Sequence, residues 1–204
     1  MKNSKQIILS ILTLLFCANV FAQENYQQKI KAYQKNYVQE HEVVKGKDKK
    51  NFKFFKPNSR YHVMATFTKM NDSVGFIMKT SGTRDKKFFR YGIINFSIDN
   101  KPLQLTVYSS EQLMNDTAYK GYLFLPFTDL TSGNNSYGGG RYIDLLFSAI
   151  QENKISIDFN KAYNPYCVYA YGYNCPIPPK ENHLSIAIKA GEKMYVGKKK
   201  ERED

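Results

Sequence analysis

The residues best suited to chemistry lie between positions 122 and 192, where apolar runs alternate with polar segments rich in Gly and Pro. Loops that combine charged side chains with rigid turns are common places for binding and catalytic sites. In this region we predict a ligand site lined by Asp129, Tyr137, Arg141, Asp158, Asn160, Asn164 and Glu181. Arg141 would pair with an anionic group of the ligand, and Asp158 or Glu181 would be the catalytic general base if the protein is an enzyme.

Three consecutive glycines, at positions 138–140, immediately precede Arg141. Glycine tolerates positive φ and lets a ligand approach the backbone closely, so exposed amides and Arg141 could together hold a carboxylate or a phosphate. The segment lacks the Gly-Lys-Ser/Thr ending of a phosphate-binding P-loop. Glycines required by a β-bulge explain the same residues, and the sequence leaves both interpretations open.

Two carboxylates are predicted to lie on a sheet face that points away from the core. Asp144 lies between Ile143 and Leu145, and Asp158 follows Ile157, so each alternates with apolar residues. Such carboxylates could line a pocket. The alternative is that this face of an antiparallel sheet is simply solvated.

Five tyrosines crowd the segment that follows: Tyr163, Tyr166, Tyr169, Tyr171 and Tyr173. Tyrosine rings can stack on sugars, and their hydroxyls can bond to ring substituents. The chain has no Trp, which weakens a glycan-binding interpretation. Amphipathic tyrosines in a loop that is half packed and half solvated explain the same pattern.

Cys167 and Cys175 are the only cysteines after position 22, and we predict that they form a disulfide, as is usual in exported proteins. Two weaker alternatives use His183, either as a further metal ligand or as the base of a nucleophilic cysteine. The spacing of these residues matches no standard zinc pattern. Neither a metal nor another cofactor is therefore predicted.

Residues 1–22 have the features of a secretory signal peptide. A basic start is followed by an apolar stretch over residues 7–16 and by Val20-Phe21-Ala22. We expect cleavage after Ala22 and export to the periplasm or the cell exterior. The apolar stretch is too short to cross a bilayer, so no transmembrane segment is predicted in the mature chain.

The chain is basic, with a net charge of +12. Removing Lys2 and Lys5 leaves 28 basic against 18 acidic residues, a net charge of +10. The lysines concentrate in segments 45–56 and 198–200, which we interpret as solvated charge on the surface. Export and this uneven distribution argue against a nucleic-acid partner. The oligomeric state is left open.

An amphipathic helix is predicted over residues 24–40, because its apolar side chains recur at intervals of three and four residues. A period of two begins at position 61 and predicts short strands. The clearest are 61–67, 74–79, 94–98, 103–107, 143–147, 155–159 and 184–188. Asp99-Asn100 would turn the third of these back on the fourth as a hairpin.

This pattern predicts a single, mainly β domain, an antiparallel sandwich or barrel with the N-terminal helix packed outside it. The chain would then divide into a signal peptide, 1–22, and a helix with a Lys-rich linker, 23–56. A β domain, 57–196, and a charged tail, 197–204, would follow.

Four long motifs carry a resemblance to a known family: FTDLTSG (127–133), SYGGGRYIDL (136–145), DFNKAYNPYC (158–167) and CPIPPKENHL (175–184). With KAGEK (189–193), they resemble the uncharacterised bacterial proteins grouped as domain of unknown function 1684. The resemblance implies an exported member of the type found in Bacteroidetes. It implies no activity, cofactor or catalytic residue.

Two functional hypotheses follow from the sequence. In the first, the exported domain binds a small anionic or polyhydroxylated ligand, such as a small molecule or a glycan, and hydrolysis of that ligand is left open. In the second, it is a non-catalytic structural or interaction protein of the cell envelope, and its polar motifs only shape turns.

Overall fold

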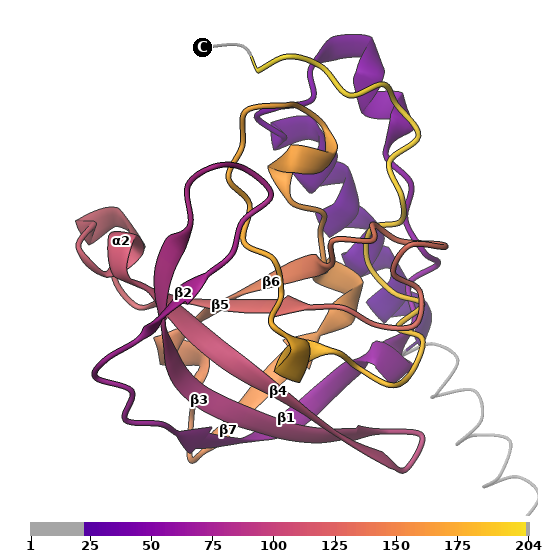
Figure 1. Cartoon of the computed structure of the whole chain (residues 1–204). Helices are drawn as coiled ribbons and strands as arrows, with labels where there is room; N and C mark the ends of the chain where they lie inside the picture. The colour runs from indigo at the N-terminus through magenta and orange to yellow at the C-terminus, as the bar shows by residue number, and fades with distance from the viewer. Residues whose placement is uncertain (1–22, 203–204) are drawn as a thin grey trace, which may run out of the picture.

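The computed structural model describes residues 23–202, so the predicted signal peptide lies outside the described residues. A helix over residues 23–40 opens the described chain and confirms the predicted helix (Figure 1). The strands are β1 (His62–Lys69), β2 (Phe76–Met78), β3 (Lys86–Ile98), β4 (Lys101–Ser110), β5 (Tyr122–Phe127), β6 (Arg141–Leu146) and β7 (Lys154–Asp158). The short helices are α2 (Glu111–Met114), η1 (Gly46–Asn51), η2 (Ser59–Tyr61), η3 (Thr117–Tyr119), η4 (Phe147–Ala149), η5 (Phe159–Lys161), η6 (Tyr166–Val168) and η7 (Lys180–Asn182).

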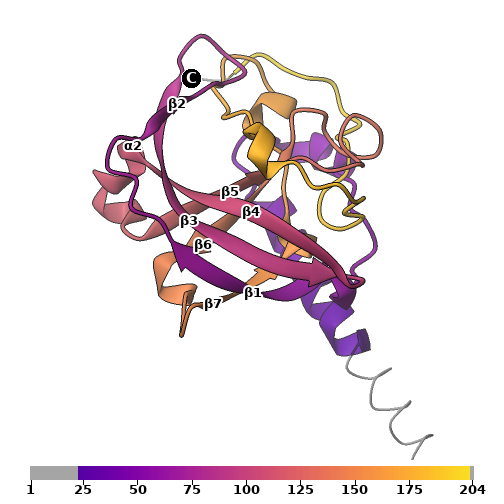
Figure 2. The same cartoon turned by 60° about the horizontal axis from the view of Figure 1, so that its bottom comes forward.

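The strands form one seven-stranded antiparallel sheet in the order β6-β5-β4-β3-β1-β7, with β2 paired to β3. The sheet curls into a half-barrel, and the N-terminal helix lies outside it (Figures 1 and 2). The predicted mainly β fold with an outer N-terminal helix is therefore confirmed. It takes the form of a single curled sheet.

Alternation along the strands determines which side chains reach the core. In β1, Ala65 and Phe67 are buried, whereas Met64 and Thr66 are exposed. The predicted hairpin joins β3 to β4, and its two turn residues, Asp99-Asn100, have φ values of 51° and 60°. Positive φ at both central positions is typical of the turns that join antiparallel strands tightly.

A bulge in β3 lets the sheet curl. The register between β3 and β4 shifts between Arg90 and Gly92, and bulges increase the local bend and twist of a strand. A Cβ at Gly92 would lie 2.4 Å from the ring of Phe67 on β1. Gly92 is therefore required by the close approach of β1 and β3 at the bend.

The main core contains inward-facing side chains from β1 and from β3 to β7, packed with Leu184, Ile188 and Ala190 from the C-terminal region. A second cluster is formed by Val44, Phe52, Tyr169 and Tyr195, and Tyr37 and Val38 of the helix pack against it. This cluster joins the helix and the Lys-rich linker to the end of the chain.

The predicted strand at 184–188 is wrong, because this segment is irregular. Leu184 and Ile188 are buried as the alternation requires. Two backbone hydrogen bonds join the segment to residues 128–130: the amide of Leu184 donates to Thr128, and the amide of Leu130 donates to Ile186. The segment forms no continuous ladder of strand hydrogen bonds beyond these. The carbonyl of Ile188 accepts a hydrogen bond from the Arg141 side chain.

Candidate functional site

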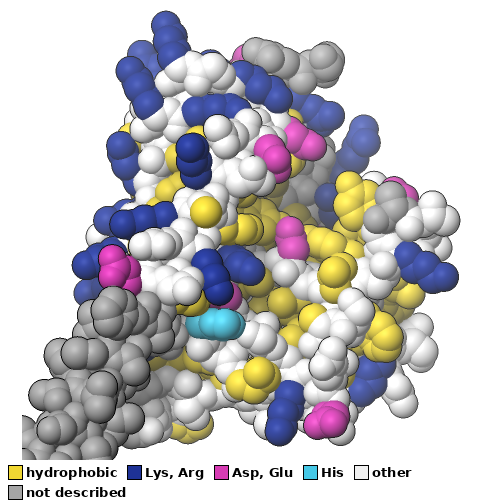
Figure 3. Space-filling model, turned by 180° about the vertical axis from the view of Figure 1, so that it is seen from behind, with side chains coloured by type: hydrophobic (Ala, Val, Ile, Leu, Met, Phe, Trp, Pro, Cys, Tyr) yellow, Lys and Arg dark blue, Asp and Glu magenta, His cyan; other side chains and the backbone are white. Residues whose placement is uncertain are grey.

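A cavity of about 910 Å³ opens between the N-terminal helix, the β5–β6 edge of the sheet and the C-terminal loops. Cavities of this size hold small molecules in many proteins. Eight of its lining residues are tyrosines: Tyr33, Tyr37, Tyr119, Tyr122, Tyr142, Tyr163, Tyr166 and Tyr173. The space-filling view shows a face hollowed over side chains of the hydrophobic and tyrosine class, with acidic groups within it (Figure 3).

Pairing of β5 and β6 positions the acidic group at one end of this cavity. Asp144 pairs with Phe124 across the two strands and lies on the same face as Tyr142, two residues earlier. The backbone of Tyr163 exchanges two hydrogen bonds with that of Tyr142, at 2.9 and 3.0 Å. These bonds bring the Tyr163 ring beside Asp144.

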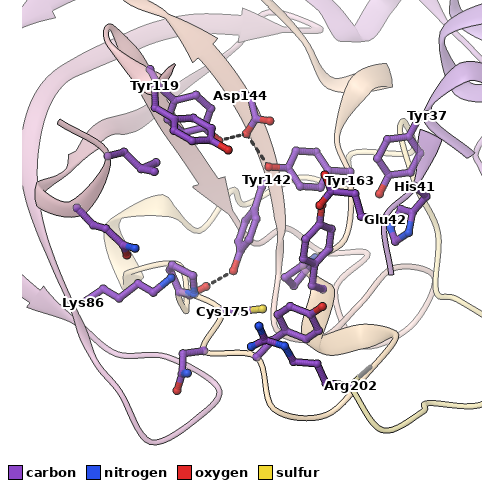
Figure 4. Close-up of a pocket in the computed structure, with 18 of the residues that line it drawn as sticks. Tyr37, His41, Glu42, Lys86, Tyr119, Tyr142, Asp144, Tyr163, Cys175 and Arg202 are labelled. Carbon is purple, nitrogen blue, oxygen red and sulfur yellow. Dashed lines mark hydrogen bonds between the residues drawn. The ribbon is translucent and has the colours of Figure 1, made fainter. Parts of the chain in front are cut away.

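The Asp144 carboxylate is held by tyrosine hydroxyls (Figure 4). Its Oδ1 accepts a hydrogen bond from Tyr163 at 2.6 Å and another from the hydroxyl of Tyr122. Among the described residues, no side chain or amide donates to Oδ2, and no cationic group lies within ion-pair distance of the carboxylate. Asp144 is reached by solvent through the cavity, yet the surrounding protein desolvates it and raises its pKa.

The tyrosines around Asp144 remain protonated donors at neutral pH. Burial, and secondarily the charge of Asp144, raises the pKa of Tyr33 to about 12. The same two causes raise the pKa of Tyr122 and of Tyr163 well above the usual range. A phenol that keeps its proton can donate to a carboxylate, so Tyr122 and Tyr163 both donate to Asp144 at neutral pH (Figure 4).

The other acidic groups of the cavity wall have donors of their own. Glu42 accepts a hydrogen bond from Tyr166 at 3.1 Å, Glu40 accepts one from Asn36 at 2.9 Å, and Asp85 is paired with Lys79. The basic lining groups are Arg84, Lys86, His41 and Arg202. Figure 4 places Lys86 and Arg202 away from the Asp144 end.

None of the seven predicted ligand-binding residues lines this cavity. Arg141 is fully buried, and its guanidinium group bonds to Asp129 and to the carbonyls of Ile188, Ala190 and Glu192. The predicted pairing of Arg141 with a ligand anion is therefore corrected, because the side chain is enclosed and both of its Nη atoms bond inside the protein. Arg141 and Asp129 are brought together, but as an internal ion pair.

Asp158 and Asn160 meet under the N-terminal helix. Asp158 Oδ1 accepts hydrogen bonds from the Tyr26 hydroxyl at 2.8 Å and from the Asn160 amide group. Asn160 also bonds to the backbone of Asn58 through both its oxygen and its nitrogen. The two residues therefore attach the N-terminal helix and the residue before η2, Asn58, to the end of β7. Asp158 does not line the cavity, so it is not placed there as a general base.

The remaining predicted residues are dispersed. Asn164 is buried, and it bonds to Glu192 and to the carbonyl of Lys193. Glu181, the second predicted base, is exposed and accepts a hydrogen bond from Tyr108 at 3.1 Å. The Tyr137 hydroxyl lies 3.8 Å from the sulfur of Cys167.

The predicted disulfide is not present: Cys167 and Cys175 are free cysteines, and both are buried. The amide of Cys167 donates to the Cys175 sulfur at 3.2 Å. A hydrogen bond from the Cys175 thiol lowers the pKa of Cys167, and the same bond raises the pKa of Cys175. The sulfurs therefore act as donor and acceptor. Cys175 lines the cavity, whereas the Nδ1 of His183 bonds to Thr128 at 3.0 Å.

Sequence reasoning found part of the cavity. The alternation that placed Asp144 away from the core was correct, and Tyr163, Tyr166 and Tyr173 of the predicted tyrosine cluster line the cavity. It missed the contributions of the N-terminal helix and of β5. The sequence signal for the helix contribution is its amphipathic stripe, in which three of the five side chains are tyrosines. The five are Tyr26, Ile30, Tyr33, Tyr37 and Val38.

The protein family described as "Protein of unknown function (DUF1684)" matches residues 47–193. The chain belongs to this family. Among solved structures, it is similar to an uncharacterised protein of Haloarcula marismortui determined by solution NMR. The two share 26% sequence identity and a TM-score of 0.60 over 86% of this chain and 97% of that chain. No curated protein matches the chain.

The DUF1684 match includes the Asp144 end of the cavity on β5 and β6 but begins after the N-terminal helix. Tyr33 and Tyr37 of the helix therefore complete a wall that the matched region leaves open. Within residues 23–202, no three His, Cys, Asp or Glu side chains are grouped to hold a metal ion. No helix in the same range is long and apolar enough to cross a membrane.

Proposed function

We propose that this DUF1684 protein is an exported binding protein whose cavity takes a polyhydroxylated small molecule. The observation that carries the proposal is the Asp144 carboxylate. One of its oxygens is held by two tyrosine hydroxyls, and the other has no donor among the described residues. A carboxylate oxygen accepts hydrogen bonds from ligand hydroxyls, and tyrosine rings offer flat faces for a sugar ring.

The proposal is for binding alone. The two carboxylates first considered as general bases, Asp158 and Glu181, lie outside the cavity. An anionic substituent on the ligand would meet Lys86 or Arg202, since Arg141 is enclosed. The sequence hypothesis of a small ligand is therefore kept, and its site moves from the glycine loop to the β5–β6 edge.

A melting screen of the chain from Gln23 to Asp204 tests the proposal. Neutral sugars and oligosaccharides should raise the melting temperature, because a ligand that binds only the folded state stabilises it. Asp144→Ala should abolish the shift, whereas Asp99→Asn, which changes an exposed carboxylate at the β3–β4 turn, should retain it. If no polyhydroxylated compound shifts the transition, the binding proposal fails and the alternative of a non-catalytic interaction protein is favoured.

Export is the second part of the proposal. It is supported by the basic and apolar pattern of residues 1–22. Expression of the full chain in a bacterium that secretes proteins should give a product that begins at Gln23. Intact-mass measurement of a product that retains Met1 would contradict export.

A further inference from the structure

We infer that the ligand of the tyrosine-lined cavity carries an ammonium group that binds Asp144, as an amino sugar or an aminocyclitol does. The inference rests on the proposed binding function and specifies its ligand class. Its basis is the negative charge of Asp144, which no cationic side chain of the described residues neutralises.

Asp144 has no counterion in the described part of the chain. Its carboxylate has two tyrosine hydroxyls as donors and, in residues 23–202, no Lys, Arg or His within ion-pair distance. A carboxylate without a counterion is disfavoured wherever the protein partly removes it from water. A ligand ammonium would supply that counterion and donate to the free Oδ2, through a hydrogen bond strengthened by both charges.

The rings around Asp144 suit a cation as well. Tyr119 and Tyr122 line the same cavity, and their rings contact each other edge to face at 6.1 Å between centroids. Tyr33 also lines it, but its ring already has Lys161 Nζ over it at 5.4 Å. Tyrosine faces are electron-rich and attract cations within about 6 Å of the ring centre. A neutral hydroxyl would gain the hydrogen bond to Asp144 but not this attraction.

Asp144 is the cavity carboxylate that two tyrosine hydroxyls hold. Asp85 is already paired with Lys79, and Glu42, which like Asp144 has no ion-pair partner among the described residues, receives the hydroxyl of Tyr166. On the basic side, Arg202 lies over the ring of Tyr173 at 5.0 Å. Lys86 and Arg202 lie away from the Asp144 end of the cavity in Figure 4, so an ammonium group at Asp144 would not be placed beside them.

Burial of the neighbouring His41 reinforces this selectivity. The pKa of His41 is lowered to about 4 by burial and by the nearby Lys49 and Lys45. Its Nδ1 accepts hydrogen bonds from two backbone amides, so the ring is a neutral acceptor at neutral pH. The wall contributed by the end of the N-terminal helix therefore adds no positive charge from His41 to repel a cationic ligand.

Calorimetric titration of the chain from Gln23 with three probes tests the inference. The probes are glucosamine, which has both an ammonium group and hydroxyl groups, glucose, which has hydroxyl groups alone, and tetramethylammonium. The last has a positive charge but no N–H, so it measures the attraction of the carboxylate and the tyrosine rings for a cation without the hydrogen bond. Glucosamine should bind at least about tenfold more tightly than glucose, since a charge-assisted bond is about twice as strong as a neutral one. Asp144→Asn should remove this preference, and Asp99→Asn, which changes an exposed carboxylate at the β3–β4 turn outside the cavity, should preserve it.

The outcomes separate the two proposals. Equal affinity for glucose and glucosamine, with equal loss in Asp144→Asn, would overturn the ammonium inference and support the binding of neutral polyols. Binding of glucosamine and tetramethylammonium without glucose would support the inference and show that hydroxyl groups contribute little. If the folded native protein binds none of the three probes, the ammonium inference and the binding proposal are both overturned. Glucosamine affinity should also fall as the pH is lowered through the pKa of Asp144, because the protonated acid no longer attracts the cation.

Discussion

The Nη2 atom of Arg141 donates a hydrogen bond of 2.9 Å to Oδ2 of Asp129, and neither side chain is exposed to solvent. Through the same guanidinium group, β6 bonds to carbonyls at Ile188, Ala190 and Glu192. Asp129 in turn accepts a hydrogen bond from the amide of Ile188. This pair therefore ties the irregular C-terminal segment to the sheet.

Replacement of Arg141 by Ala should lower the free energy of unfolding by about 3–5 kcal/mol, because it leaves a buried carboxylate without its cation. The measurement is urea-induced unfolding with the slope m compared between variants. Arg60→Ala breaks an exposed pair with Asp99 and should cost less than about 1 kcal/mol. An Arg141→Ala protein as stable as the Arg60→Ala control would contradict a structural role.

Glu192 should make stability depend on pH. It is fully buried, and burial raises its pKa to about 7 despite hydrogen bonds from Asn164, Tyr169 and Tyr37. Because the folded pKa exceeds the unfolded value of about 4.3, the stabilisation is fully present below that value and is lost as the pH rises through about 7. The loss should reach at most about 4 kcal/mol, since each pKa unit corresponds to about 1.4 kcal/mol.

Unfolding of the native protein and of Glu192→Gln at pH values across this window measures the effect. Their difference cancels the titration of all other groups, including His41, whose lowered pKa acts in the opposite direction. Glu152→Gln, at an exposed turn, serves as control. Parallel stability curves for the native protein and Glu192→Gln would refute the assignment.

The glycines before Arg141 should act through steric constraints. Gly140 has a φ of 89°, and an added Cβ would lie 2.7 Å from the carbonyl oxygen of Phe127. Gly140→Ala should therefore lower the unfolding free energy by more than about 1 kcal/mol. Gly133 has a similar φ, 84°, but open space around its Cβ position, so Gly133→Ala should cost less. Melting temperatures of the two variants, ranked in the reverse order, would contradict this steric account.

The two cysteines should be titrated as free but protected thiols. Cys167 and Cys175 are buried, although Cys175 lines the cavity, so a thiol reagent too bulky for the cavity should react slowly with the native chain from Gln23 and rapidly after denaturation. Intact-mass analysis after alkylation in denaturant should give two modified thiols per chain. A mass that corresponds to the oxidised pair would restore the disulfide predicted from the sequence.

Local patterns in the sequence were enough to predict most of the secondary structure. Alternation in β1, β3, β4, β6 and β7, the turn at Asp99-Asn100 and the helix stripe all reflect interactions between residues close in sequence or directly paired. The same alternation placed Asp144 on the correct face. The segment 184–188 shows the limit of this reasoning, because burial alone does not show whether a backbone pairs with a strand.

The site itself was decided by tertiary structure. Arg141, the residue with the strongest apparent chemistry, is neutralised by Asp129 and by carbonyls about fifty positions later in the chain, which no local pattern reveals. The cavity draws its wall from the N-terminal helix, α2, the strands β3, β5 and β6, and the C-terminal loops. Within residues 23–202, Asp144 has two tyrosine donors and no cation, and whether a charge is compensated depends on every segment that packs around it.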